Sequence, residues 1–281
     1  MSGAQAARAA GGAQSTRAAS GAQATRSEVC AVALADALRG SGERLVSCFG
    51  LAPQVGARLA KLSFEPDLLL TDGICSLLAE AQPISGPRAP GGPDAPEPVV
   101  EGWLPFRSVF DLLWNGRRHV VMVASQIDRH GNQNFACIGP HPKPKAQLLG
   151  MRGAPGNTIH HRTSYWIPNH SPKVFVEQVD VVSGVGYDRA AALGPQSARF
   201  HDIHRVVSNL GVFDFETPER RMRLRSRHPG VSAQEIAQQT GFELAPNAEE
   251  APETRAPTAE ELRLIREFID PEGRANSEVR G

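Results

Sequence analysis

Apolar runs separated by polar turns recur along most of the chain and predict alternating strands and helices. Residues 120–124 form an apolar run that is typical of a buried strand, and residues 66–70 end in leucines that predict a second strand of the parallel type. Two helices are expected before that leucine strand: one capped by Ser27 and ending near Leu38, and one from 53 to 62. This alternation predicts an α/β sheet with right-handed crossovers.

The pattern of apolar positions continues in the second half of the chain. Residues 102–114 have helical spacing and a heavy aromatic face, which suggests core packing or a subunit interface. Alternation predicts a strand over 174–182. The remaining expected elements are two strands within 204–215 broken at 208–211, a strand over 222–227, and helices capped by Ser232 and Thr258.

The two ends and one internal segment differ from the rest in composition. Residues 3–29 contain a nine-residue repeat with arginines at 8, 17 and 26 and no large apolar residue before Val29, so residues 1–24 are predicted to be a disordered Ala/Gly/Arg extension. A targeting peptide has similar composition, but an extension or a misassigned start is favoured. We expect one domain over 25–270, a surface insertion at the Pro-rich segment 83–98, and a tail at 271–281.

Overall composition narrows the classes of function. The chain has 30 basic and 30 acidic residues, which argues against nucleic acid as the main partner. No apolar run reaches the roughly 20 residues of a membrane span. The four cysteines are widely spaced and form no CxxC pair, so no zinc site or disulfide framework is expected, and a cytoplasmic location fits. Adjacent His160 and His161 point in different directions, so no metal site is expected there either.

Polar residues and glycines gather after the strand at 120–124. Gln126 and Asp128 follow it, and Asn134 comes shortly after the tight-turn pair Gly131-Asn132. Three glycines within 150–157 would let backbone N–H groups approach a ligand. Together these features suggest a site for a polar, acyl-type ligand, although a plain hairpin and a connecting loop would give the same pattern.

A second candidate lies at the end of the leucine strand. Thr71, Asp72 and Gly73 follow Leu70 directly. Open α/β sheets bind ligands at the carboxyl ends of their strands. The alternative is an ordinary turn.

Five short strings of residues, in the order in which they occur along the chain, resemble strings in the β subunit of family I coenzyme A transferases. The resemblance covers roughly residues 25–270. The resemblance implies an open, mostly parallel sheet with helices on both faces. Further strings, such as 116–122 and 164–166, resemble one subgroup in particular, the β subunits of hydrolases that open the last steroid ring. The strings shared with the whole family are Leu70-Thr71-Asp72-Gly73, Gln126-Ile127-Asp128 with Gly131-Asn132-Gln133-Asn134, Gly153 to Asn157, 205–213, and His228-Pro229-Gly230-Val231 leading to 240–244.

The strand-end string departs from that of the transferases. Those enzymes carry a glutamate there that attacks the acyl-CoA and forms a covalent thioester. If Thr71 occupies its position, the covalent route is closed; if Asp72 does, the carboxylate is one methylene short. The resemblance to the hydrolases instead implies water attack on a cyclic β-oxo acyl-CoA, followed by C–C bond cleavage.

The resemblance also implies partners and roles. An α subunit would complete an α2β2 heterotetramer, with the active site at the α/β interface and the catalytic acid on α. No cofactor is expected beyond the coenzyme A of the substrate. A CoA transferase for a 3-oxo or dicarboxylic acid and a non-catalytic scaffold remain as alternatives. The expected catalytic residues are Thr71, Asp72, Gln126 and Asn132, and the expected substrate- or CoA-binding residues are Gly73, Asn134, Gly153, Gly156 and Asn157.

Overall fold

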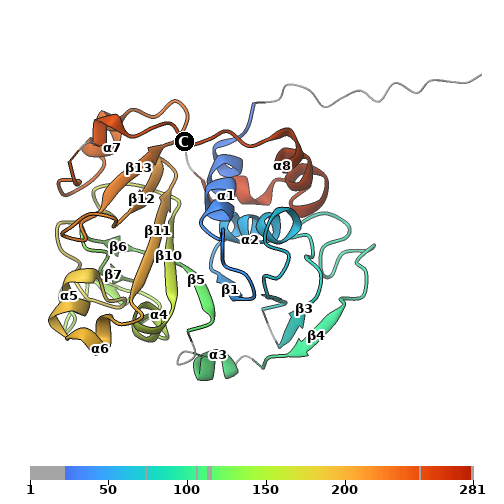
Figure 1. The fold of residues 1–281 in the computed structure, drawn as a ribbon, viewed down its shortest axis with the longest axis horizontal. Helices are drawn as coiled ribbons and strands as arrows, with labels where there is room; N and C mark the ends of the chain where they lie inside the picture. The colour runs from blue at the N-terminus through green and yellow to red at the C-terminus, as the bar shows by residue number, and fades with distance from the viewer. Residues whose placement is uncertain (1–22, 74, 106, 113–115, 247, 280–281) are drawn as a thin grey trace, which may run out of the picture.

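A six-stranded sheet forms the centre of the computed structural model, which describes residues 23–279 except 74, 106, 113–115 and 247 (Figure 1). Its strand order is β1-β5-β10-β11-β12-β13. The first four strands run parallel and the last two are antiparallel to their neighbours, which confirms the predicted open, mostly parallel sheet. The strands are β1 (Leu45–Cys48), β5 (Arg118–Val123), β10 (Arg162–Ile167), β11 (Asp202–Ser208), β12 (Gly211–Asp214) and β13 (Arg223–Arg227).

Helices α1 (Arg26–Asp36) and α2 (Leu51–Ser63) cover one face of this sheet (Figure 1). Where they pack on each other, a Cβ on Gly56 would lie 2.8 Å from the carbonyl oxygen of Ala31, so only glycine allows this contact. The predicted Ser27 cap is wrong. Thr25 caps α1 instead, and its hydroxyl accepts the amide N–H of Glu28, while Ser27 is buried in the first turn.

The opposite face carries the largest hydrophobic cluster, which includes Val120, Tyr165 and Phe213. Helix α4 (Ala154–His160) and the hairpin of β6 (Gln126–Ile127) and β7 (Gln133–Asn134) cover it. None of the described helices is long and apolar enough to cross a membrane. The remaining elements are β8 (Cys137–Ile138), β9 (Ala146–Gln147), α5 (Tyr187–Ala192), α6 (Pro195–Ala198), α7 (Ala233–Gln238) and α8 (Ala259–Leu264), with the 3-10 helices η2 (Ala248–Glu250) and η4 (Arg274–Ser277) and the π-helix η3 (Ile265–Ile269). Ser232 and Thr258 cap α7 and α8, as predicted.

A small antiparallel sheet lies beside β1. It consists of β2 (Leu70–Thr71), β3 (Ser76–Leu78) and β4 (Val100–Trp103). The sequence predicted a buried parallel strand over 66–70, but only Leu69 pairs with β1, opposite Leu45. The chain then leaves the central sheet, and Leu70 and Thr71 pair with β3.

Two other expected elements differ from the structure. Residues 102–114 do not form one helix: Trp103 ends β4, and α3 spans only Ser108–Asp111, while residues 106 and 113–115 lie outside the described part. Residues 174–182 form no strand. Their buried side chains, Phe175 and Val179, are four positions apart, whereas a half-buried strand buries every second residue.

The Pro-rich segment 83–98 and the C-terminal residues are joined by hydrogen bonds. The segment is a series of turns, and most of it is exposed. Its first residues are anchored, because Ile84 N–H donates to the carbonyl of Ile269 and the Ser85 hydroxyl donates to Asp270. Residues 1–22 of the predicted extension lie outside the described part.

Candidate active site

A cavity of about 360 Å³ opens where β1 and β2 separate. The two segments pair only at Leu45 and Leu69, and beyond that point each belongs to a different sheet. Residues 46–48 of β1 and the following residue, Phe49, form one wall, and residues 70–73 and Cys75 form the other. Helix α2 closes the back with Gln54, Ala57 and Arg58, and Arg118 also lines the cavity. The split in the sheet therefore places the strand-end string in a cavity.

The three predicted residues at the strand end line this cavity together and also build their own turn. The Thr71 hydroxyl accepts the N–H of Gly73 at 3.1 Å. Asp72 Oδ1 accepts the N–H groups of Cys75 at 2.9 Å and Ser76 at 3.0 Å. Gly73 has φ of +82°, a conformation that other residues rarely adopt. Both readings of this string, turn and site, are thus compatible, and the carboxylate of Asp72 is fixed by backbone donors.

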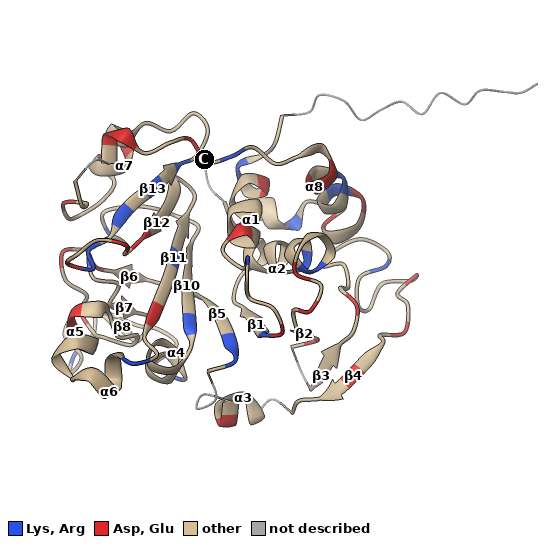
Figure 2. Cartoon of the chain, in the orientation of Figure 1, with Lys and Arg blue, Asp and Glu red and all other residues tan. Residues whose placement is uncertain are grey.

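Arg118 is a cavity residue that the sequence analysis missed. It is the first residue of β5, whose start is basic (Figure 2), yet only 3% of it is exposed. Its Nε donates to the Ser47 hydroxyl at 2.9 Å and its Nη1 donates to Oδ1 of Asn157 at 3.3 Å. Burial lowers the pKa of Arg118 to about 10, so the guanidinium stays charged at neutral pH. An arginine that opens an apolar run was the available signal.

Arg58 is a second cation in the cavity wall. Its Nε donates to the carbonyl of Gln82 at 2.6 Å and its Nη1 donates to the carbonyl of Gln54 at 3.1 Å. Burial lowers the pKa of Arg58 as well. In the described part of the chain, neither Arg58 nor Arg118 forms an ion pair with a carboxylate of the protein. Two arginines against the single acid Asp72 make the cavity suited to an anionic ligand.

The predicted amide residues of the hairpin are buried away from this cavity lining. The Asn134 amide donates to Oε1 of Gln126 at 2.7 Å, and the Gln126 amide donates to Asp180 at 3.0 Å. Asn132 donates to Asp128 and Asp188, both at 2.9 Å, and accepts the N–H of Gly186 at 2.8 Å. These side chains therefore bind to one another and to neighbouring loops, which gives them a supporting place in the fold.

The glycine-rich stretch 150–157 is only partly a loop. Gly153 precedes α4, whereas Gly156 and Asn157 lie inside this helix, where the Asn157 N–H donates to the carbonyl of Gly153. The Asn157 backbone amide is thus occupied within the helix. Its side chain is the part that reaches the candidate site, because its oxygen accepts from Arg118. Among the predicted site residues other than Thr71, Asp72 and Gly73, Asn157 forms a hydrogen bond with a described residue of the cavity lining, Arg118.

Other strings shared with the transferases meet in a buried polar cluster. The ring of His170 bonds to the hydroxyls of Ser208 and Thr240, at 2.9 and 3.0 Å. His228 bonds to the carbonyl of Ser208 at 2.9 Å. These contacts join the end of β11, the turn before α7 and the end of α7. This part of the resemblance reflects the architecture of the fold, since none of these residues lines the cavity.

Known proteins with similar sequences and structures share this fold and indicate the family of the chain. No family model matches the chain. It is 53% identical over 253 residues to the cholesterol ring-cleaving hydrolase IpdB subunit of Rhodococcus jostii (strain RHA1), covering 90% of this chain and 95% of the relative. The crystal structure of Rhodococcus jostii RHA1 IpdAB matches with a TM-score of 0.85 and 50% identity, over 92% of this chain and 100% of that one. Glutaconate coenzyme A-transferase from Acidaminococcus fermentans matches with a TM-score of 0.71 and 25% identity, over 88% and 95%.

Proposed function

The chain belongs to the family of cholesterol ring-cleaving hydrolase IpdB subunits, and on that premise we propose that it is the β subunit of an enzyme that opens the last steroid ring by adding water. The substrate is a cyclic β-oxo acyl-CoA that remains after the other rings have been removed. The working enzyme contains an α partner and is an α2β2 heterotetramer in the cytoplasm, where acyl-CoA substrates occur.

The reaction needs no covalent nucleophile. Water adds to the ring ketone, and the bond between that carbon and the α-carbon of the thioester then breaks. The former ketone carbon leaves as a carboxylic acid that carries the oxygen of water. The electron pair of the broken bond passes to the thioester as an enolate, which takes up one proton at the α-carbon. Because the thioester itself holds the electron pair, the reaction requires no cofactor beyond the coenzyme A of the substrate.

The state of Asp72 is the observation that carries this proposal. Its carboxylate lines the cavity but accepts two backbone N–H groups, which stabilise its charge and lower its nucleophilicity. Thr71, its neighbour, carries no carboxylate. A transferase-type thioester on this strand end is therefore disfavoured, and water becomes the attacking group.

An α partner supplies what the described cavity lining lacks. No histidine lines it, and its only acid, Asp72, is engaged by the N–H groups of Cys75 and Ser76, so we assign the base that activates water to the α partner. Two exposed apolar side chains lie in or next to lining segments: Phe49 lines the cavity and is 51% exposed, and Trp103 precedes the lining residue Leu104 in the chain and is 74% exposed. Exposed apolar side chains of this kind fit a protein interface. We therefore place the α subunit over this opening, with its catalytic acid directed into the cavity.

Co-expression with an α-type partner tests the proposal. The complex is incubated with the ring-derived CoA thioester in water labelled with oxygen-18. We expect one labelled oxygen in the new carboxylate of the ring-opened product, and no turnover by either subunit alone. A complex that leaves the ring intact would contradict the proposal.

CoA transfer with Asp72 as nucleophile is the second candidate, since the glutaconate coenzyme A-transferase shares this fold and Asp72 lines the cavity. Hydroxylamine added after incubation with acyl-CoA separates the two functions. Only the transferase forms an enzyme-bound thioester, and trapping would convert Asp72 to a hydroxamate. An α subunit that turns over alone would instead leave this chain the role of a scaffold.

A further inference from the structure

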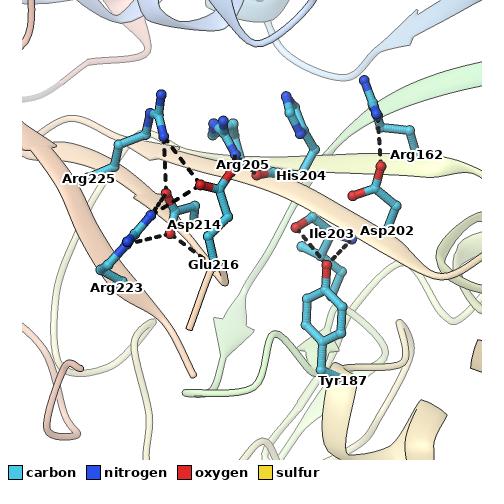
Figure 3. A network of polar contacts seen from close by, with 10 residues as sticks. All are labelled: Arg162, Tyr187, Asp202, Ile203, His204, Arg205, Asp214, Glu216, Arg223 and Arg225. Carbon is cyan, nitrogen blue, oxygen red and sulfur yellow. Dashed lines mark hydrogen bonds and ion pairs between the residues drawn. The ribbon is translucent and has the colours of Figure 1, made fainter. Parts of the chain in front are cut away.

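Arg118 differs from four other arginines of the central sheet, because no carboxylate among the described residues forms an ion pair with it. Figure 3 shows four arginines of β10, β11 and β13, each paired with a carboxylate: Arg162 with Asp202, Arg205 with Glu216, and Arg223 and Arg225 with Asp214. Arg118 is more deeply buried than these, yet no ion pair joins it to any described carboxylate. A buried charge without a partner is costly, and such groups persist mainly where a ligand provides the opposite charge.

The two side chains that hold Arg118 orient it without neutralising it. Ser47 and Asn157 offer a hydroxyl and an amide oxygen, both uncharged, to Nε and Nη1. Nη2 has no hydrogen-bond partner among the described residues. The charge reaches neighbouring groups: the pKa of buried His161 falls to about 4, first because of burial and second because of repulsion by Arg118. The guanidinium is therefore fixed in place and carries its full positive charge into the cavity.

From this arrangement we infer that Arg118 is a catalytic residue that binds the thioester enolate oxygen formed when the ring C–C bond breaks, with Ser47 and Asn157 as its positioning residues. This inference rests on the proposed function. The substrate's thioester oxygen is neutral before cleavage and negative after it, so a fixed cation stabilises the transition state more than the bound substrate. The proton that later quenches the enolate goes to the α-carbon and leaves the guanidinium unchanged.

The contact between Arg118 and Asn157 allows a test of charge at constant shape. Asn157→Asp replaces an amide by a carboxylate of the same size at a hydrogen bond of 3.3 Å. The new carboxylate would neutralise Arg118 while keeping it in place. A merely structural Arg118 would be held better by this ion pair, whereas a catalytic Arg118 would be disabled by it.

Steady-state kinetics of the α/β complex on the ring-derived CoA thioester decide the matter. We expect Arg118→Met to lower kcat by roughly a hundredfold or more with KM changed less than about threefold, the usual size of one lost oxyanion donor. Asn157→Asp should lower kcat more than Asn157→Ala, and Arg118→Lys should lose less than Arg118→Met. Arg117→Met is the matched control, because this neighbouring side chain is 66% exposed and lies outside the cavity lining; it should keep wild-type kcat.

Three outcomes overturn the inference. An Arg118→Met complex with wild-type kcat would remove Arg118 from catalysis. A loss confined to KM would make it a ground-state binding residue. A higher kcat for Asn157→Asp than for Asn157→Ala would show that the role of Arg118 is structural. This comparison of the two Asn157 variants remains decisive if the Arg118→Met variant does not fold. A wild-type complex that leaves the thioester intact would overturn the proposed function itself, and this result is distinct from all three.

Discussion

The carboxylate of Glu278 closes the amino end of helix α2, where its Oε1 accepts the N–H of Leu51 at 2.7 Å. Its other oxygen accepts the N–H of Ala52 at 3.0 Å and the indole N–H of Trp166 at 3.2 Å. A negative charge at this position satisfies free backbone donors and is favoured by the helix dipole. The C-terminal segment thereby fixes the helix that carries Arg58 into the cavity.

Replacing Glu278 should therefore destabilise the fold, although this residue is far in sequence from the helix that it caps. We expect Glu278→Ala to lower the free energy of unfolding by about 1–2 kcal/mol, the usual effect of a lost helix cap. Urea unfolding followed by circular dichroism measures it. Glu272→Ala, at an exposed position of the same segment, is the control and should change little. Equal stability of the Glu278 variant and the wild type would show that this cap contributes nothing.

Asn132 should act through stability, because all of its side-chain hydrogen-bonding groups are engaged. Asn132→Ala would remove the side-chain donor to Oδ2 of Asp128 and the acceptor of the Gly186 N–H, which we expect to cost about 2–4 kcal/mol. The same urea experiment tests this, with turnover measured on the folded fraction. Unchanged stability with a tenfold loss of turnover would instead return Asn132 to the active site, where the sequence analysis placed it.

Two of the three helix caps predicted from the sequence are confirmed, whereas the cap at Ser27 and the contacts between distant residues were not predicted correctly. Ser232 and Thr258 cap helices through contacts three residues away, so the sequence shows them directly. The cavity role of Thr71 and Asp72 followed from their place at a strand end. Arg118 could not be found this way, because its burial depends on Ser47 and Asn157, 71 and 39 positions away in the sequence.

The wrong helix over 102–114 has a related cause. Its aromatic spacing resembled one amphipathic face, but Trp103 ends an edge strand and is 74% exposed. Apolar periodicity reports the face that a chain buries in its own core. Here Trp103 and Phe110 are 74% and 45% exposed, so the aromatic spacing does not mark a face that this chain buries.

Stability should fall as the solution becomes acidic. Burial lowers the pKa of His170 to about 3 and that of His228 to about 4. In the unfolded chain both take up protons below about pH 6.5, whereas the folded chain resists until pH 4 or lower, so their stabilisation is complete above pH 6.5 and is lost on acidification. Each should cost about 2 kcal/mol between pH 7 and pH 5.

Urea unfolding at these two pH values provides the measurement. His170→Gln, which keeps a polar side chain but does not titrate, should have the shallower pH dependence. His141→Gln, at an exposed histidine, should keep the wild-type slope. A wild-type protein equally stable at pH 5 and pH 7 would contradict the assignment of neutral buried histidines.

Trp103 should matter to assembly and little to the fold of this chain. Its ring is 74% exposed, and the next residue in the chain, Leu104, lines the cavity over which we place the α subunit. We expect Trp103→Asp to weaken α/β association by roughly a hundredfold, since a buried aromatic residue at an interface contributes about 2–4 kcal/mol. Sedimentation velocity of mixed subunits measures this. Leu193→Asp, 65% exposed and outside the cavity lining, is the control; equal loss of binding in both variants would argue against the placement.

The turnover of Asp72→Asn in the α/β complex tests the central claim most directly. An asparagine oxygen accepts the same two N–H groups of Cys75 and Ser76, so the turn and the cavity should persist. If water attacks and Asp72 only supports the site, kcat on the ring-derived CoA thioester should stay within about tenfold of wild type. A loss on the order of ten-thousandfold, the size expected for removal of a covalent nucleophile, would contradict the account.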